Sequence, residues 1–153
     1  MLGVMVVDNK GKITYLQVIK EDLAIFKITP ENGQIPDFKA GQFLTIGTNV
    51  PSEGKIIRRA YSIASAPEQK KHWELYIRWV KKPVPGRLTT QLFNMKEGDD
   101  ILWVKPTGIF TINEKMHDGS TDNRRMVLIG GGTGIAPFVS YSQHLHAVQS
   151  NRE

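Results

Sequence analysis

Hydrophobic and polar residues alternate in short runs along the first two thirds of the chain, with the period of two that half-buried β-strands show. Gly, Pro, Asn and Asp separate these runs. Short alternating runs bounded by turn residues favour an antiparallel β-barrel or β-sandwich, so we expect a mainly β fold. The predicted strands are residues 12–19, 23–28, 42–46, 59–64, 73–80, 101–105 and 109–112.

A helical spacing interrupts the strands once. Leu88, Leu92 and Met95 follow one another at intervals of four and three residues. Gly86 precedes this run and Gly98 lies just beyond it, as is typical of helix ends. The pattern therefore predicts one helix that caps the β-rich part of the chain.

The pattern changes after residue 115. Residues 116–123 are polar and predict a connection. Residues 126–129 are all apolar, which is typical of a parallel strand buried on both faces. Five residues, 130–134, form a glycine-rich turn, and apolar residues at helical spacing follow it up to Val148. Strand, glycine turn and helix together form the first βα unit of an α/β nucleotide-binding domain.

This organisation predicts two domains, a β-barrel over residues 1–115 and the beginning of an α/β domain over residues 124–153. A parallel strand leaves backbone N–H and C=O groups unpaired until neighbouring strands join it. A single βα unit therefore does not form a domain. We expect the chain to be a fragment of a longer protein, or the remainder to be a separate polypeptide.

Composition narrows the possible functions. The chain has 153 residues and no cysteine, which excludes disulfides, thiol nucleophiles and iron–sulfur clusters held by this chain alone. Its four histidines have no metal-ligand spacing, so we expect surface histidines and no metal site. No apolar run is long enough to span a membrane, and the first residues lack a secretory pattern, which predicts a cytoplasmic protein without membrane contact.

Positive charge is concentrated in one part of the chain. The formal net charge is +5. Residues 55–105 carry eleven Lys or Arg and five Asp or Glu, a local net charge of +6. An anionic partner is therefore expected, which leaves open a phosphate ligand, an acidic protein or nucleic acid.

Residues 59–62, Arg-Ala-Tyr-Ser, could bind a flat anionic ligand. In a strand, Arg59 and Tyr61 lie on one face, where a guanidinium could bind a pyrophosphate and a phenol could contact an aromatic ring. Alternation places Ser62 on the opposite face, so it reaches the same ligand only if the strand bends. Four residues alone are also compatible with a solvated Arg and a core Tyr.

Two glycine-containing motifs could bind phosphate. Gly86-Arg-Leu-Thr89 opens the predicted helix, although a Thr there could equally be an ordinary cap. Gly132-Thr-Gly134 continues to Pro137 and lies between a predicted strand and a predicted helix, the context of a dinucleotide-binding turn. The acidic residue that would report NADP or NAD preference would fall beyond residue 153.

The order and spacing of these motifs resemble the ferredoxin–NADP reductase family, most closely its bacterial members. The resemblance rests on Arg59–Ser65, Gly86–Thr89, Lys105-Pro-Thr-Gly108 and Gly132–Phe138, and it covers about residues 10–148. It implies a Greek-key β-barrel that binds FAD, followed by the start of an NADP-binding domain.

The resemblance also implies roles for individual residues. Arg59 would bind the FAD pyrophosphate, Tyr61 would stack on the isoalloxazine ring, and Ser62 would hydrogen-bond near flavin N5, so Tyr61 and Ser62 are the expected catalytic residues. Thr133 would meet the flavin and nicotinamide. The other expected cofactor-binding residues are Ala60, Tyr76, Gly86, Arg87, Leu88, Thr89, Gly132 and Gly134.

The implied function is a flavoprotein oxidoreductase that moves electrons between NAD(P)H and an acidic carrier, ferredoxin or flavodoxin. FAD would be the cofactor and NADP or NAD the co-substrate. Two alternatives remain from the sequence. One is a basic β-barrel that binds nucleic acid or protein without redox activity, which leaves the glycine turn unexplained. The other is an FAD-binding fragment that is inactive alone.

Overall fold

Six strands form one antiparallel sheet in the computed structural model, which describes residues 7–112, 115–120, 122 and 124–150. The outermost residues of the two predicted domains and parts of the predicted connection lie outside these ranges. The strand order is β4-β3-β6-β1-β2-β5. The strands are β1 (Asn9–Lys20), β2 (Leu23–Pro30), β3 (Phe43–Val50), β4 (Lys55–Ser62), β5 (Trp73–Arg78) and β6 (Asp100–Thr107).

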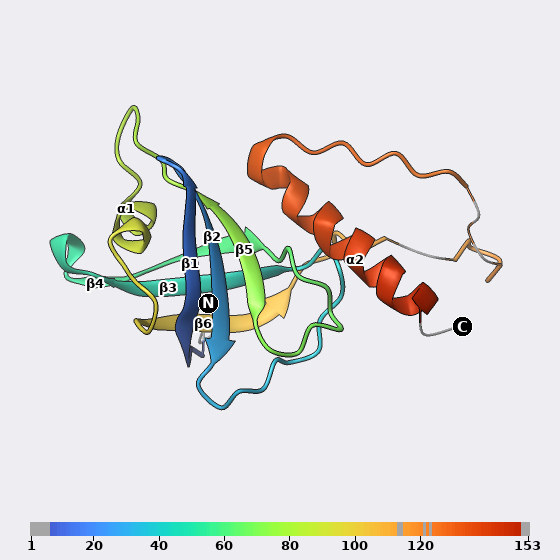
Figure 1. The fold of residues 1–153 in the computed structure, drawn as a ribbon, viewed down its shortest axis with the longest axis horizontal. Coiled ribbons are helices and arrows are strands. Elements are labelled where there is room, and N and C mark those ends of the chain that lie inside the picture. Colours follow the sequence, from blue (N-terminus) through green and yellow to red (C-terminus); the bar gives the residue numbers. More distant parts are fainter. Residues whose placement is uncertain (1–6, 113–114, 121, 123, 151–153) are drawn as a thin grey trace, which may run out of the picture.

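The sheet curls until its two edge strands approach each other. Strands β1, β2 and β5 cross over β3, β4 and β6, as Figure 1 shows. The edges β4 and β5 meet through one isolated antiparallel bridge, Ile63 with Leu75. The mainly β, antiparallel fold is confirmed, but the ladder is not closed into a complete barrel. Beyond the bridge, β4 pairs with β3 and β5 with β2 among the described residues.

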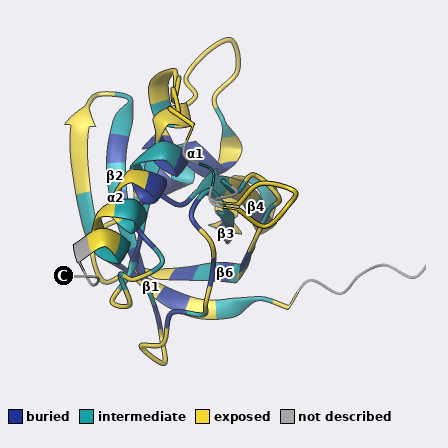
Figure 2. Cartoon of the chain, turned by 90° about the vertical axis from the view of Figure 1, so that its right-hand side faces the viewer, coloured by how far each residue is buried: buried dark blue, intermediate teal, exposed yellow. Residues whose placement is uncertain are grey.

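The core fills the space between the two halves of the curled sheet. Strand β2 alternates half-buried and buried residues along its whole length, and Phe26 is fully buried. Trp73 of β5 packs against Trp103 of β6, with ring centroids 4.8 Å apart. Figure 2 shows buried residues distributed along the strands and in helix α1. Burial of these large apolar side chains is the main source of stability for such a fold.

The helix α1 (Arg87–Phe93) closes one end of this core. Its Leu88 and Leu92 are buried, and Phe93 lies 6.3 Å from the Phe26 ring, centroid to centroid. The helix was expected from the spacing of its leucines, and it is confirmed. It ends one residue before Asn94, so Met95 packs against the core from beyond the helix.

Two predicted strands are absent from the described part of the chain. Residues 109–112 are irregular because Gly108 has a φ of 130°, which turns the chain away and leaves Ile109 fully exposed. Residues 126–129 are also irregular, and Ile129 is 86% exposed. A strand buried on both faces needs hydrogen-bonding neighbours, and no described strand pairs with this segment. The structure thus contains the turn and helix of the predicted βα unit, but not its strand.

The short 3₁₀ turn η2 (Gly132–Ile135) leads directly into helix α2 (Ala136–Ser150). This helix was predicted from its apolar spacing and is confirmed. It lies at one side of the curled sheet (Figure 1). Phe138 of α2 contacts Phe110, with ring centroids 5.9 Å apart. The contact joins the C-terminal helix to the segment that follows β6.

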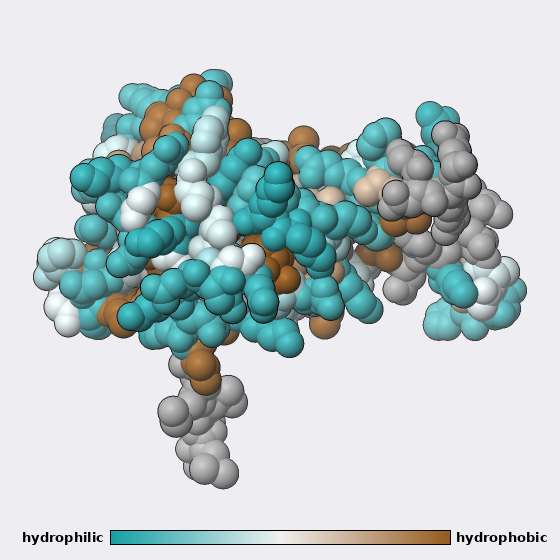
Figure 3. All heavy atoms as spheres, turned by 60° about the horizontal axis from the view of Figure 1, so that its bottom comes forward, coloured by the Kyte–Doolittle hydropathy of each residue, from teal (hydrophilic) through white to brown (hydrophobic). Residues whose placement is uncertain are grey.

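Most of the surface in Figure 3 is hydrophilic, and its hydrophobic groups form scattered patches. In the described ranges, no helix has the length and apolar character needed to cross a membrane.

Candidate functional site

The opening between β4 and β5 is the central feature of the candidate site. The bridge between Ile63 and Leu75 brings the two strands together at one end. Each strand has a hydrogen-bonded neighbour on one side only in the described sheet. The facing edges therefore offer backbone N–H and C=O groups to a ligand, because such groups need partners when they are buried.

Arg59 and Tyr61 lie on the same face of β4, as predicted. Their partners on β3 are Ile46 and Leu44, both fully buried, and paired residues of antiparallel strands share a face. Tyr61 is half-buried against the core. Burial raises the pKa of Tyr61 to about 12, and the positive charge of Arg59 opposes that shift. The two side chains are therefore close enough to interact, and the phenol is neutral at physiological pH.

The Arg59 guanidinium has no acidic partner among the described residues. It is exposed, and its Nη1 donates a hydrogen bond to the carbonyl oxygen of Arg58 at 2.7 Å. Arg58, next to it on the opposite face, is instead held by two hydrogen bonds to the carboxylate of Asp8. Of these two arginines, Arg59 retains donors for an anionic ligand.

Ser62 and Tyr76 belong to the outer face of the sheet. Ile63 and Leu75 are both fully buried at their bridge, so alternation turns Ser62 and Tyr76 outward. Continuing the antiparallel register from the bridge places these two residues opposite each other. Burial, with a smaller effect of Glu74, raises the pKa of Tyr76 to about 12. The predicted site residues are thus divided between the two faces of the sheet: Arg59 and Tyr61 lie on the inner face, and Ser62 and Tyr76 lie on the outer face. Ala60 is exposed on β4 between Arg59 and Tyr61.

The predicted pyrophosphate loop lies at the start of α1, where several of its groups already have partners. The hydroxyl of Thr89 donates to the carbonyl oxygen of Gly86 at 3.2 Å and accepts from the backbone N–H of Val80 at 3.4 Å. Leu88 is buried in the core, so only its backbone can contact a ligand. Gly86 is required here because a Cβ would lie 2.5 Å from the Thr89 hydroxyl oxygen.

Glu53 is a residue near this loop that the sequence did not indicate. Arg87 Nη1 lies 3.2 Å from Glu53 Oε2, which comes from the turn between β3 and β4. The Arg87 side chain is 59% exposed, so most of its donors remain accessible. No local pattern could have shown this pair, because the two residues are 34 positions apart.

The glycine turn is close to the outer face of β5. A Cβ on Gly132 would lie 4.0 Å from Arg78 Nη1, and Gly132 has a φ of 55°, a conformation that favours glycine. A Cβ on Gly131 or Gly134 would meet no atom within 4 Å, so the turn is open on one side. The turn and β5 share a pocket of about 400 Å³. It is lined by Tyr76, Gly132 and Thr133 together with Ile135, Arg78 and the β1–β2 hairpin.

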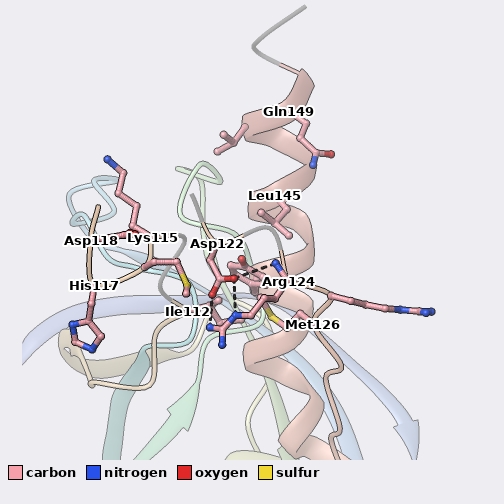
Figure 4. Close-up of a pocket in the computed structure, with 13 residues that line it drawn as sticks. Ile112, Lys115, His117, Asp118, Asp122, Arg124, Met126, Leu145 and Gln149 are labelled. Atoms are coloured by element: carbon pink, nitrogen blue, oxygen red, sulfur yellow. Dashed lines mark hydrogen bonds and ion pairs between the residues drawn. The ribbon is translucent and has the colours of Figure 1, made fainter. Parts of the chain in front are cut away.

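A larger hollow lies beside α2. It has a volume of about 1390 Å³ and separates the connection after residue 112 from the helix face that carries Leu145 and Gln149. Figure 4 shows Asp122 and Arg124 paired within it, and Met126 is another of its lining residues. None of the predicted cofactor residues lines this hollow. The described residues contain no cluster of His, Asp and Glu that could hold a metal ion.

The residues present at the opening fit an FAD molecule. Arg59 offers a guanidinium without an acidic partner, Tyr61 offers a neutral, half-buried ring, and the turn at Gly132 brings exposed backbone close to β5. A guanidinium can bind the charged diphosphate of FAD, a tyrosine ring can pack against its flat ring system, and exposed backbone can hydrogen-bond to the polar edge of that ring.

The family comparison agrees with this geometry. A family model described as "Oxidoreductase FAD-binding domain" matches residues 10–112. The ferredoxin–NADP reductase of Pseudomonas aeruginosa is 40% identical over 124 residues, which is 80% of this chain and 43% of that protein. The chain belongs to the ferredoxin–NADP reductase family and contains its FAD-binding domain.

More distant relatives share the domain but differ in their described functions. The flavohemoprotein of Bordetella pertussis is 29% identical over 134 residues, 86% of this chain and 32% of that protein. A ferredoxin NADP⁺ reductase structure from Neisseria gonorrhoeae with bound FAD and NADP has a TM-score of 0.70 and 27% identity, covering 93% of this chain and 53% of that one. The chain therefore spans about half or less of the proteins it resembles.

Proposed function

We propose that this chain binds FAD in the opening between β4 and β5. The observation that carries the proposal is the placement of Arg59 and Tyr61 on one face of β4, beside the place where the sheet fails to close. Family membership establishes an oxidoreductase FAD-binding domain, and these residues are our assignment of its site.

Each proposed residue performs a role that its environment supports. Arg59 binds the diphosphate through its free donors, with Arg87 as a second cation at the start of α1. Tyr61 holds the ring system with its half-buried, uncharged phenol. Ser62, on the opposite face of β4 from Tyr61, would hold a proton at flavin N5 where the ring edge extends past the open edge of this strand. Ala60, Gly86, Leu88 and Thr89 contribute backbone groups and shape.

Bound FAD would supply hydride and single-electron chemistry, which no side chain of this protein can supply itself. Tyr76, Gly132 and Thr133 line the pocket beside β5. We assign Tyr76 to a contact with FAD, and we assign Thr133, with Gly132 and Gly134 of the same turn, to the place where the flavin meets NADP or NAD. We assign residues 1–115 to the FAD-binding domain and residues 124–153 to the start of an NAD(P)-binding domain. The large hollow beside α2 supports this division, because that helix face has no covering sheet among the described residues.

We further propose that the electron partner is ferredoxin or flavodoxin. The Pseudomonas aeruginosa relative is a ferredoxin–NADP reductase, and the Buchnera aphidicola relative, 38% identical over 110 residues, is a flavodoxin/ferredoxin–NADP reductase. The net positive charge of residues 55–105 complements an acidic carrier. The flavohemoprotein relative makes a haem domain the competing partner.

Titration of the purified chain with FAD tests the site directly. We expect bound flavin with perturbed visible absorbance and quenched fluorescence, and weaker binding of FMN, which lacks the diphosphate and adenosine. Preparations that take up neither flavin would overturn the proposal. The partner is tested separately, by measuring salt-dependent binding of ferredoxin, flavodoxin and a globin domain to the FAD-loaded chain.

A further inference from the structure

A row of side chains on α2 joins this helix to the segment that follows β4. Ser140, Gln143 and His144 are spaced so that they lie on one face of the helix. Ser140 Oγ donates to the carbonyl oxygen of Ser65 at 2.7 Å, and the backbone N–H of Ala66 donates to Gln143 Oε1 at 3.2 Å. His144 Nδ1 lies 2.7 Å from Glu68 Oε1. We call this row of contacts the helix seam.

The hydrogen bond of Ser140 lies at the buried end of the helix seam. Ser140 is fully buried and Ser65 is 4% exposed, so water does not substitute easily for either group. The contacts of Gln143 and His144 lie nearer to solvent. Burial therefore makes the Ser140 bond the one whose loss the structure tolerates least.

Ser65 connects three parts of the molecule. Its carbonyl accepts from Ser140, and its hydroxyl accepts from the backbone N–H of Glu74 on β5 at 3.1 Å. The neighbouring Ala64 N–H donates to the carbonyl oxygen of Glu74 at 2.8 Å. The end of β4, the start of β5 and helix α2 are thus held together at one residue.

This junction links the β4 residues of the proposed site to the helix that follows the glycine turn. Along the chain, Ser65 follows Tyr61 and Ser62 by only a few residues, and Ser140 follows Thr133 by two turns of helix. A shift of α2 along the sheet would move the glycine turn relative to Tyr61 and Ser62. Small displacements of this kind are costly in sites that depend on orientation.

We propose that Ser140 is a positioning residue for the flavin site. Through Ser65 it fixes the glycine turn of residues 132–134 relative to the β4 residues that contact FAD. Ser140 itself touches no cofactor. The inference rests on the proposed function, because it assigns a purpose to the helix seam only if FAD occupies the opening.

The test compares FAD binding by the wild-type chain, Ser140→Ala and Ser142→Ala. Ser142 is exposed on the same helix and serves as the matched control. We expect Ser140→Ala to raise the FAD dissociation constant about two- to tenfold, the net value of one hydrogen bond, and to change the visible circular dichroism of bound flavin. Ser142→Ala should do neither. If Ser140→Ala proves unstable, Gln143→Ala should produce the same changes at smaller size.

A double-mutant cycle with Thr133→Val separates positioning from general destabilisation. If Ser140 acts by placing the glycine turn, its effect on FAD affinity shrinks when the Thr133 hydroxyl is already absent. If the two substitutions act independently, so that their fold-changes in the FAD dissociation constant multiply in the double variant, the inference is overturned. Normal FAD uptake with an unchanged affinity and spectrum in Ser140→Ala would also overturn it, and would leave the proposed function intact. Absence of FAD uptake by the wild type would overturn both.

Discussion

Arg59 and Arg58 show how neighbouring residues of one type acquire different roles. They alternate across β4, so Arg58 meets Asp8 and Arg59 faces the side that carries Tyr61. The hydrogen bonds to Asp8 raise the pKa of Arg58 and occupy two of its donors, while Arg59 keeps most of its own. We therefore assign a structural role to Arg58 and the ligand-binding role to Arg59.

We expect Arg59→Ala to weaken FAD binding roughly ten- to a hundredfold, because it removes a charge-assisted hydrogen bond worth about 1.5–3 kcal/mol. Equilibrium titration followed by flavin fluorescence measures the change. Arg125→Ala, which removes the same charge from an exposed position before α2, is the control and should leave affinity near wild type. Equal affinities for both variants would show that Arg59 does not contact the diphosphate.

The raised pKa values of Tyr61 and Tyr76 lead us to expect that the protein loses stability in alkaline solution. Burial raises the pKa of Tyr61 and of Tyr76 to about 12, whereas the unfolded chain releases these protons near pH 10. Between these values the folded state binds more protons than the unfolded state, so stability falls as pH rises from about 10 to about 12. Denaturation midpoints measured across this range should fall less steeply for Tyr61→Phe. An identical slope in the variant would contradict the burial of the phenol.

At the scale of elements, the start of α1 depends on a glycine for space. A Cβ at Gly86 would lie 2.5 Å from the Thr89 hydroxyl oxygen and 3.1 Å from Val80 Cβ. We expect Gly86→Ala to destabilise the fold by about 1–3 kcal/mol, since the added methyl forces these groups apart. Thermal or urea unfolding measures the difference.

Gly131→Ala provides the control for this prediction. Gly131 has a φ of −102°, which any residue adopts, and an added Cβ would meet no atom within 4 Å. Its stability should therefore stay within about 0.5 kcal/mol of wild type, as surface substitutions usually do. A Gly86→Ala protein as stable as Gly131→Ala would mean that the start of α1 can shift to make room.

At the scale of the whole molecule, the segment before the glycine turn leaves apolar side chains in solvent. Val127 is 76% exposed and Ile129 is 86% exposed. Contiguous exposed apolar groups favour association. We expect the isolated chain to form larger species as its concentration rises, measured by light scattering after size-exclusion chromatography.

Val127→Lys combined with Ile129→Lys should suppress this association, because charge is costly to bury in an apolar contact. Val84→Lys changes a similarly exposed valine in the loop after β5 and should have little effect. A wild-type chain that stays monomeric at all concentrations tested would contradict the expected contact.

The sequence by itself determined the elements whose neighbours lie within the described chain. Alternation located parts of all six strands, and helical spacing located α1 and α2. The same alternation placed Arg59 and Tyr61 on one face, because a side-chain period of two is a property of any strand. The local pattern and the structure agree where the described chain contains the strands or core residues against which the predicted element pairs or packs.

Only the tertiary structure decided the features that depend on distant residues. The strand predicted at residues 126–129 did not form, because an apolar run becomes a strand only when other strands supply its hydrogen bonds. His144, expected on the surface, is partly exposed and contacts Glu68, a pairing that no local pattern indicated, and Ser140 gave no local signal of its bond to Ser65. A sequence pattern indicates the secondary structure that a segment favours. Contacts between residues far apart in the sequence depend on how the sheet curls.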